Sequence, residues 1–162
     1  MALTKDKKKD ILAKLGDIAT KDSAVFVNFH KLPVSDTTAM RQKLREEGIG
    51  YYVTRKTLIG KAFGEASITG TMPELEGEAA IAYADDLTGP AREIYGFHKE
   101  FGGAVSILGG VFEGRFMDKA EMEEIATIPA TPVLRGMFVN VINSPIQGMV
   151  IALQAIAGKK TA

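Results

Sequence analysis

Cysteine is absent from this sequence of 162 residues. Without thiols the chain can form neither a disulfide framework nor a thiolate zinc site, and it suits a reducing compartment such as the cytoplasm. The N-terminal residues MALTKDKKKD lack the apolar stretch that a signal peptide needs. Histidine is scarce as well: His30 and His98 stand alone, and no pattern around them suggests metal ligation. We expect a cytoplasmic protein without a metal.

The motifs of common enzymes are missing too. No serine lies in a nucleophile elbow. Gly48–Gly50 and Gly109–Gly110 lack the lysine and the following helix of a phosphate-binding loop, so we interpret both as turns. The glutamates of Glu121–Glu124 are typical of a solvated acidic helix. The sequence therefore predicts no catalytic residue and no cofactor.

Acidic residues are absent from the apolar C-terminal segment, residues 129–162. A membrane-spanning helix needs ~20 mostly apolar residues in a row. This segment is interrupted by Arg135, Asn140, Asn143, Pro145, Gln147 and Gln154. We therefore expect no membrane span and no membrane partner.

The charges that are present are segregated along the chain, although they sum to zero. Residues 1–61 hold 13 Lys or Arg against 7 Asp or Glu, residues 62–128 hold 4 against 13, and residues 129–162 hold 3 against none. Such segregation predicts a basic face for a polyanion, an acidic remainder and a tail with its own task. The alternative is that the segments mix in space, because blocks along a sequence need not form surface patches.

Hydrophobic spacing and turn residues predict the order of elements in residues 1–128. Helices are expected at 4–19, 36–47, 55–63, 88–101 and 118–127, with Thr4, Ser35, Thr54 and Thr88 as N-caps. Strands are expected at 24–30, 48–54, 79–85 and 104–112, and Glu113-Gly114 is expected to turn the last strand back into RFM.

If the short helix at 55–63 is an insertion, this order is the β-α-β-β-α-β pattern of a ferredoxin-like (split β-α-β) plait, an α+β fold. The pattern predicts a four-stranded sheet with helices on one face. It leaves the packing of the N-terminal helix open.

After Pro129 the character of the chain changes, and we expect an extended apolar C-terminal segment, residues 129–162, separate from a globular domain at residues 1–128. Pro145 fits poorly inside a helix, so we expect one helix ending near Asn143 and another from Pro145 to about Ala157. Apolar residues recur here at alternating spacings of four and three: Ile142, Ile146, Met149, Leu153 and Ile156. A helix this apolar needs a partner on more than one side. The alternative is that it folds back on its own sheet.

Three basic clusters occupy residues 1–61: Lys5, Lys7, Lys8 and Lys9; Arg41, Lys43 and Arg45; and Arg55, Lys56 and Lys61. The first and third lie near the start of an expected helix, where the positive end of the helix dipole disfavours cations. A phosphate group resolves this conflict, because it binds both the free backbone N–H groups and the side chains. The clusters therefore predict binding to an RNA or DNA backbone. The alternative is a solvated lysine face.

The segment TTAMRQKLREEGIGYYVTRKTLIGKAF resembles the signature of the tenth large-subunit ribosomal protein family, the stalk-base proteins of bacteria. Further similar stretches are LEGEAAIAYADD, ILGGVFEGR, IATIP and the terminal NSPIQGMVIALQAIAGKK. Together they cover nearly the whole chain in order.

The resemblance implies a non-enzymatic scaffold. Its N-terminal domain would dock on the GTPase-associated region of large-subunit ribosomal RNA, beside the eleventh large-subunit ribosomal protein, with Thr57 joining the three basic clusters. Its C-terminal helix would carry dimers of the stalk protein, which recruit translational GTPases. Two alternatives stay open: a ribosome-assembly paralogue that lacks the stalk-binding helix, and a small enzyme with an acidic cleft.

The length of the C-terminal segment predicts how many stalk dimers it holds. Pro145 divides the segment into two apolar stretches of about three turns each, and each stretch is long enough to lie across one small helical dimer. We therefore expect two dimers. The residues expected to bind them are Leu134, Phe138, Val141, Ile142, Ile146, Met149, Val150, Leu153 and Ile156.

Overall fold

The computed structural model describes residues 5–66 and 68–160, so Thr4, the expected cap of the first helix, lies outside the described residues. Contacts within the chain divide it into two compact units, Met1–Ile128 and Pro129–Ala162.

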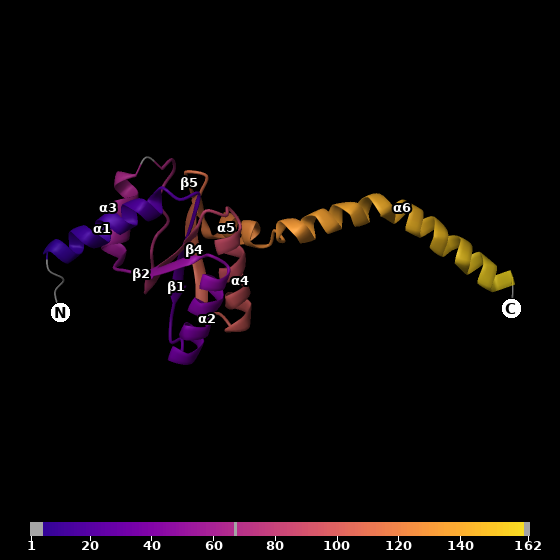
Figure 1. Ribbon diagram of the computed structural model, residues 1–162, viewed down its shortest axis with the longest axis horizontal. Coiled ribbons are helices and arrows are strands. Elements are labelled where there is room, and N and C mark those ends of the chain that lie inside the picture. The colour runs from indigo at the N-terminus through magenta and orange to yellow at the C-terminus, as the bar shows by residue number, and fades with distance from the viewer. Residues whose placement is uncertain (1–4, 67, 161–162) are drawn as a thin grey trace. The chain divides into compact units, whose positions relative to one another are not determined.

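The first unit alternates helices and strands (Figure 1). Its helices are α1 (Lys5–Ala19), α2 (Val34–Glu46), α3 (Lys56–Glu65), α4 (Gly89–Glu100) and α5 (Lys119–Ala126). Its strands are β1 (Ser23–Phe29), β2 (Gly50–Val53), β3 (Ala79–Ala84), β4 (Val105–Phe112) and β5 (Arg115–Asp118).

In the described residues the strands form one sheet with the order β2-β3-β1-β4-β5, and every neighbouring pair is antiparallel. The connection from β1 through α2 to β2 passes over β3, and the connection from β3 through α4 to β4 passes over β1. This is the split β-α-β arrangement, so the predicted α+β, ferredoxin-like fold is confirmed. The expected number of four strands is wrong, because β5 pairs with β4 and extends the sheet.

Helices cover both faces of the sheet, and the expectation of helices on one face is wrong. Val25 and Val27 of β1 pack in one cluster with residues of α2, α4 and α5. Ala24 and Phe26 point the other way and pack with residues of α1 and α3. A strand buried on both faces has a continuous apolar run rather than an alternating one, and β1 has such a run.

The packing of α1 and α3 explains the N-terminal helix that the sequence left unplaced. Leu15 of α1 and Ile59 of α3 are fully buried in the same cluster. The ring of Phe63 meets the ring of Phe26 edge-on, with centroids 5.2 Å apart. The short helix α3 is therefore part of the core and not a peripheral insertion.

Two of the expected helix caps are wrong. Pro33 is the N-cap of α2, and the Ser35 hydroxyl donates to the Asp36 carboxylate at 2.9 Å instead. Arg55, not Thr54, is the N-cap of α3. Thr88 does precede α4 as expected, although its side chain makes no capping hydrogen bond.

Gly109–Gly110 is not a turn, because both residues lie within β4. The register of β1 against β4 shifts beside them, between Phe26 and Val27. A Cβ on Gly110 would lie 2.6 Å from the Ala24 carbonyl oxygen, so only glycine lets these strands approach so closely. The expected turn at Glu113-Gly114 is confirmed: both residues have positive φ, 49° and 73°, as a two-residue hairpin loop requires.

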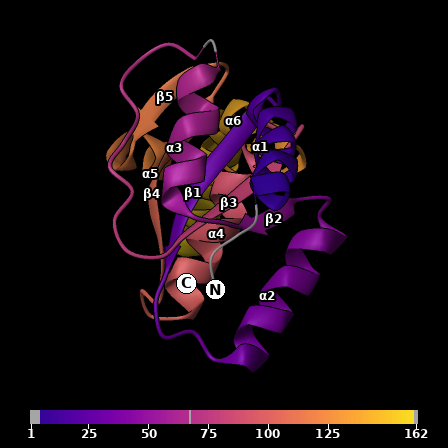
Figure 2. The same cartoon turned by 90° about the vertical axis from the view of Figure 1, so that its left-hand side faces the viewer.

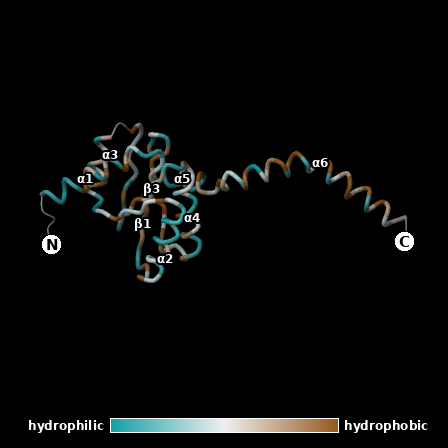
Figure 3. Tube along the Cα trace, viewed as in Figure 1, coloured by the Kyte–Doolittle hydropathy of each residue, from teal (hydrophilic) through white to brown (hydrophobic). Residues whose placement is uncertain are grey.

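The second unit contains the helix α6 (Thr131–Lys160), which is continuous over 30 residues. The expected division into two helices is wrong, because Pro145 lies inside α6. Figure 1 shows that the helix bends near its middle, the usual effect of a proline that removes one backbone hydrogen bond. Residues 131–158 are all exposed, and hydrophobic residues recur along the whole length of α6 (Figure 3).

By length and composition, residues 131–158 also form a helix apolar enough to cross a membrane. The polar interruptions alone therefore do not exclude a span.

Candidate nucleic-acid interface

The strand β2 lies at one edge of the sheet and organises the basic residues around it. Side chains alternate between the two faces of a strand. Tyr51 accordingly packs against the cluster under α2, and Tyr52 packs against the cluster under α1 and α3. In Figures 1 and 2, β2 lies between α1 on one side and α2 on the other.

The third basic cluster lines a groove where β2 leads into α3. This β2–α3 groove has a volume of about 820 Å³ and is lined by Ile11, Phe29, residues 52–57 and residues 77–79. Arg55 has extended backbone angles, and Lys56 is the first residue of α3. The first-turn N–H groups of a helix have no intrahelical acceptor, and they attract anions together with the helix dipole. The groove thus combines the N-terminal end of α3 with cations and Thr57.

The first basic cluster lies beside the same groove. Ile11 of α1 lines the groove, and Lys7 and Lys8 precede it by four and three residues on the same side of the helix. Both lysines are exposed, as is Lys9. Nothing is described for the side chain of Lys5, although the residue belongs to α1.

The second basic cluster lies on the other side of β2. Arg41 and Arg45 line a hollow of about 330 Å³ together with residues 48–51. The Arg41 guanidinium lies 5.6 Å from the centre of the Tyr51 ring, a cation–π contact. Burial raises the pKa of Tyr51 to about 12, although the positive charge of Arg41 acts in the opposite direction.

Two predicted contact residues are engaged elsewhere. Lys43 is turned toward α4, where its Nζ lies 3.4 Å from a Glu100 carboxylate oxygen. Lys61 lies 4.0 Å from Glu65 on the next turn of α3. Both pairs are exposed and contribute little to stability, so either lysine can exchange its partner for a phosphate.

Six other cations of the predicted set differ from these two lysines. Within residues 5–66 and 68–160, no ion pair with a carboxylate is made by Lys7, Lys8, Lys9, Arg41, Arg45 or Lys56. The clusters from α1, α2 and α3 therefore surround one sheet edge. We call this the β2-edge surface. Sequence reasoning missed its two tyrosines, whose signal was the adjacent aromatic pair Tyr51-Tyr52 in a short edge strand.

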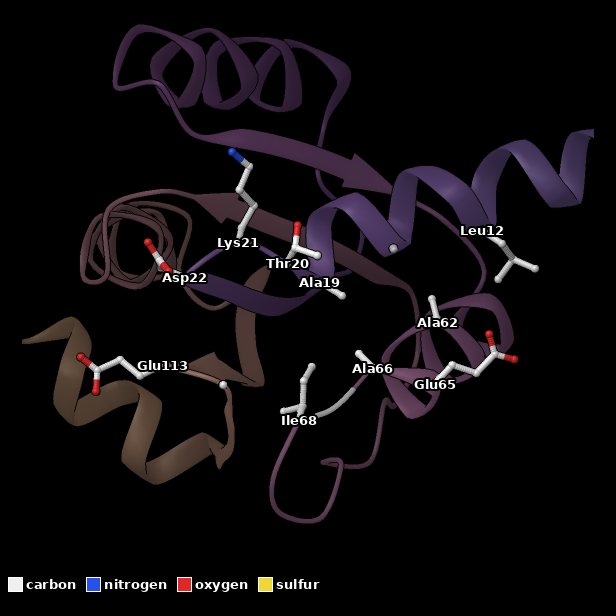
Figure 4. A pocket seen from close by; sticks show the side chains of 12 residues that line it. Leu12, Ala19, Thr20, Lys21, Asp22, Ala62, Glu65, Ala66, Ile68 and Glu113 are labelled. Atoms are coloured by element: carbon white, nitrogen blue, oxygen red, sulfur yellow. The ribbon is translucent and has the colours of Figure 1, made fainter.

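A second groove, about 610 Å³, lies between α1, the end of α3 and the β4–β5 turn (Figure 4). Its lining carries Asp22, Glu65 and Glu113 against one cation, Lys21, and this net negative charge disfavours a polyanion. Figure 4 shows Glu65 on the opposite side of the groove from Asp22 and Glu113. Carboxylates so spread do not form the converging pair that general acid–base catalysis needs.

The two isolated histidines lie in structural or surface positions. The Nδ1 atom of His98 lies 2.6 Å from the Val105 carbonyl oxygen, and its ring stacks on Tyr95. His30 is exposed, and its backbone N–H donates to the Ala104 carbonyl. No group of three or more His, Asp or Glu within the described part of the chain could hold a metal ion.

The helix α6 offers a different kind of surface. All nine residues predicted to bind a partner are exposed, at 48–70% of their full surface area. Further exposed apolar residues widen the surface beyond the predicted set: Val133, Met137, Val139 and Ile151. The apolar surface therefore surrounds the helix and does not form a single stripe. An exposed apolar surface of this extent is typical of a protein or membrane contact.

Comparison with known proteins identifies relatives that match nearly the whole chain. Residues 3–99 match the family described as Ribosomal protein L10. The chain is 35% identical over 152 residues to the large ribosomal subunit protein uL10 of Shouchella clausii, which covers 93% of this chain and 89% of the relative. It is 32% identical over 157 residues to the uL10 of Staphylococcus saprophyticus, covering 96% and 91%. It is 30% identical over 162 residues to the uL10 of Bacillus cereus, covering 99% and 97%.

Proposed function

Because the chain belongs to the Ribosomal protein L10 family, as the sequence resemblance indicated, we propose that it is a non-enzymatic scaffold of the stalk base in the large ribosomal subunit. Its first unit binds the GTPase-associated region of large-subunit ribosomal RNA, next to the eleventh large-subunit protein. Its helix α6 carries dimers of the stalk protein, and these recruit translational GTPases. The relatives in the comparison are named large ribosomal subunit proteins, which supports a ribosome-bound, cytoplasmic location.

The β2-edge surface is the observation that supports the proposed RNA binding. The positive end of the helix dipole repels cations at a helix N-terminus unless a bound anion offsets the repulsion. Lys56 occupies this position in α3. The neighbouring Lys7 and Lys8, with Arg41 and Arg45 across the strand, extend the positive surface beyond one phosphate. A repeating polyanion such as an RNA backbone matches this extent.

The exposure of the apolar side chains of α6 supports the proposed binding of stalk dimers. At 1.5 Å per residue, a 30-residue helix is about 45 Å long, and Pro145 lies at its centre. Each half is about 22 Å long, enough to lie across one small helical dimer. We therefore expect two stalk dimers. Phe138, Val141 and Ile142 anchor the first dimer, and Met149, Val150, Leu153 and Ile156 anchor the second.

The same helix distinguishes this proposal from an assembly paralogue. Such a paralogue keeps a basic domain but has no stalk-binding helix. The apolar character of α6 is explained only if something covers it, and a bilayer is the second occupant that its length and composition favour.

One experiment tests the whole proposal. The purified chain is mixed with stalk-protein dimers and with an RNA fragment of the GTPase-associated region, and native mass spectrometry counts the components of the complex. We expect one chain, one RNA and two dimers. A complex with no dimers, combined with flotation of the chain on phosphatidylcholine vesicles, would assign α6 to a membrane. Six stalk copies would show that the division at Pro145 does not set the number of dimers.

A further inference from the structure

We infer that the β2–α3 groove receives a single unpaired nucleotide of the bound RNA, with its phosphate at the start of α3 and its base against Tyr52. This inference rests on the proposed RNA binding and names the RNA element that the groove recognises. The volume of the groove, about 820 Å³, lies within the range of small-ligand sites, ~300–1,000 Å³.

The groove combines two kinds of lining, and a nucleotide needs both. One kind is apolar and aromatic: Ile11, Phe29, Tyr52 and Val53, of which Val53 is 41% exposed. The other kind is Lys56 with the first-turn amides of α3. A duplex backbone would use only the cations and amides. An unstacked base uses the aromatic wall as well, which is how proteins commonly hold single-stranded RNA.

The two adjacent tyrosines differ in a way that identifies Tyr52 as the stacking residue. Tyr51 lies on the opposite face of β2, and the Arg41 guanidinium already lies over its ring. Among the described residues other than Arg55, no aromatic ring and no cation lies against the ring of Tyr52. Tyr52 is half-buried and lines the groove, so its free surface is open to a base.

Glu78 supports a base rather than a second phosphate in this groove. It is exposed and lines the same groove. A carboxylate repels phosphate, but it accepts hydrogen bonds from the amino groups of bases, such as N4 of cytosine. The groove is therefore suited to one phosphate and one base together.

The test places 2-aminopurine, a fluorescent base, at each unpaired position of the RNA fragment in turn. With the full-length chain we expect the fluorescence of one position to change on binding. Tyr52→Leu, which keeps an apolar side chain but removes the ring, should abolish that change and weaken binding roughly 5- to 150-fold. Tyr52→Phe retains the ring and should retain both properties. The matched control is Tyr95→Leu, a half-buried tyrosine of α4 outside the β2-edge surface, which should retain the fluorescence change.

Each other outcome has a defined meaning. If no position responds, or if the response persists in Tyr52→Leu, the nucleotide site is wrong while RNA binding stands. If the unaltered chain does not bind the fragment, the proposed function fails instead. Should Tyr52→Leu not fold, 4-thiouridine at the responding position can be photo-crosslinked to the unaltered chain. Crosslinks to residues 52–57 are expected, and crosslinks confined to other residues would overturn the inference.

Discussion

The two units of the chain distribute apolar and charged side chains in opposite ways. In Met1–Ile128 the large apolar side chains form two clusters within the described residues, and the cations of the β2-edge surface are exposed. In α6 the apolar side chains are exposed and acidic residues are absent. The first unit therefore has the pattern of a domain that folds by its own core and attracts a polyanion. The second has the pattern of a helix whose apolar surface is covered by a partner.

This contrast separates stability from binding. A buried apolar side chain contributes to the folding free energy of the first unit, whereas an exposed one in α6 contributes only when a partner covers it. Substitutions of the same chemical type should thus have different consequences in the two units.

The largest effect is expected for charges introduced into α6. Replacing Leu153 and Ile156, both 57% exposed, by aspartate should remove one stalk dimer completely and leave the other bound, because unpaired carboxylates are too costly to bury at an interface. Native mass spectrometry of the co-expressed complex measures the loss. The matched control is Gln154→Asp, which adds a charge to the same turn at a polar position and should retain both dimers. Loss of both dimers, or of neither, would contradict two independent segments.

A phenylalanine pair compares the two units directly. Phe26 is fully buried, and Phe26→Ala should lower the unfolding free energy of the first unit by about 3–5 kcal/mol. Phe138 is 68% exposed, and Phe138→Ala should change this unfolding free energy by no more than about 0.5 kcal/mol. Urea denaturation measures both. The roles should reverse in a binding assay, where Phe138→Ala weakens association with the first stalk dimer. A large stability loss in Phe138→Ala would mean that α6 belongs to the core.

Removing the cations of α3 should affect RNA binding but not folding. Replacing Arg55, Lys56 and Lys61 by alanine should weaken binding and reduce the salt dependence, by roughly 0.7–0.9 in log–log slope for each RNA phosphate that the variant no longer neutralises. Filter binding at several salt concentrations measures the slope. Alanine at Lys99, Arg115 and Lys119, three exposed cations away from β2, provides the control and should leave the slope unchanged. An equal loss of RNA affinity in both triple variants would indicate that binding depends on the net charge of the chain and not on a site at α3.

Tyr51 should make the first unit sensitive to alkaline pH. An exposed tyrosine in the unfolded chain titrates near pH ~10, whereas the folded pKa is about 12. Below pH ~10 both states keep the proton, and between these values the unfolded state loses it first. Stability therefore falls as pH rises, by roughly 1 kcal/mol from this group between pH 9 and pH 11. Urea denaturation at both pH values should show a decline that is smaller by this amount in Tyr51→Phe. Equal declines would mean that Tyr51 is not buried in solution.

Much of the first unit was predictable because its signals are local. The strand order follows from alternating elements, and the hairpin at Glu113-Gly114 follows from Gly114, which tolerates positive φ. Two-sided burial of the sheet was not predictable from element order. It depends on where α1 and α3 pack, and the apolar faces of these helices do not specify which face of the sheet they cover. The turn predicted at Gly109–Gly110 was wrong for a related reason. A glycine in a turn and a glycine that lets two strands approach closely have the same signal in the sequence.

The cations of the candidate site could be predicted from the sequence, but the groove that they line could not. Cations in the first turn of α3 conflict with the helix dipole, and this conflict is visible in the residues Arg55-Lys56 alone. The groove beside them joins Ile11, Phe29 and residues 77–79 from distant parts of the chain, so only the fold brings it together. The direction of Lys43 toward Glu100 likewise depends on the position of α4.

The smallest effect is expected from removing the second unit entirely. Both hydrophobic clusters are made of residues no later than Ala126, so a chain ending at Pro129 retains every described core residue. Its unfolding free energy should stay within about 0.5 kcal/mol of that of the full chain, and it should bind the same RNA fragment with unchanged salt dependence. Urea denaturation and filter binding of the two forms make the comparison. The truncated form should also be the more soluble, because it lacks the exposed apolar surface of α6. Loss of cooperative unfolding in the truncated chain would show instead that α6 completes the core.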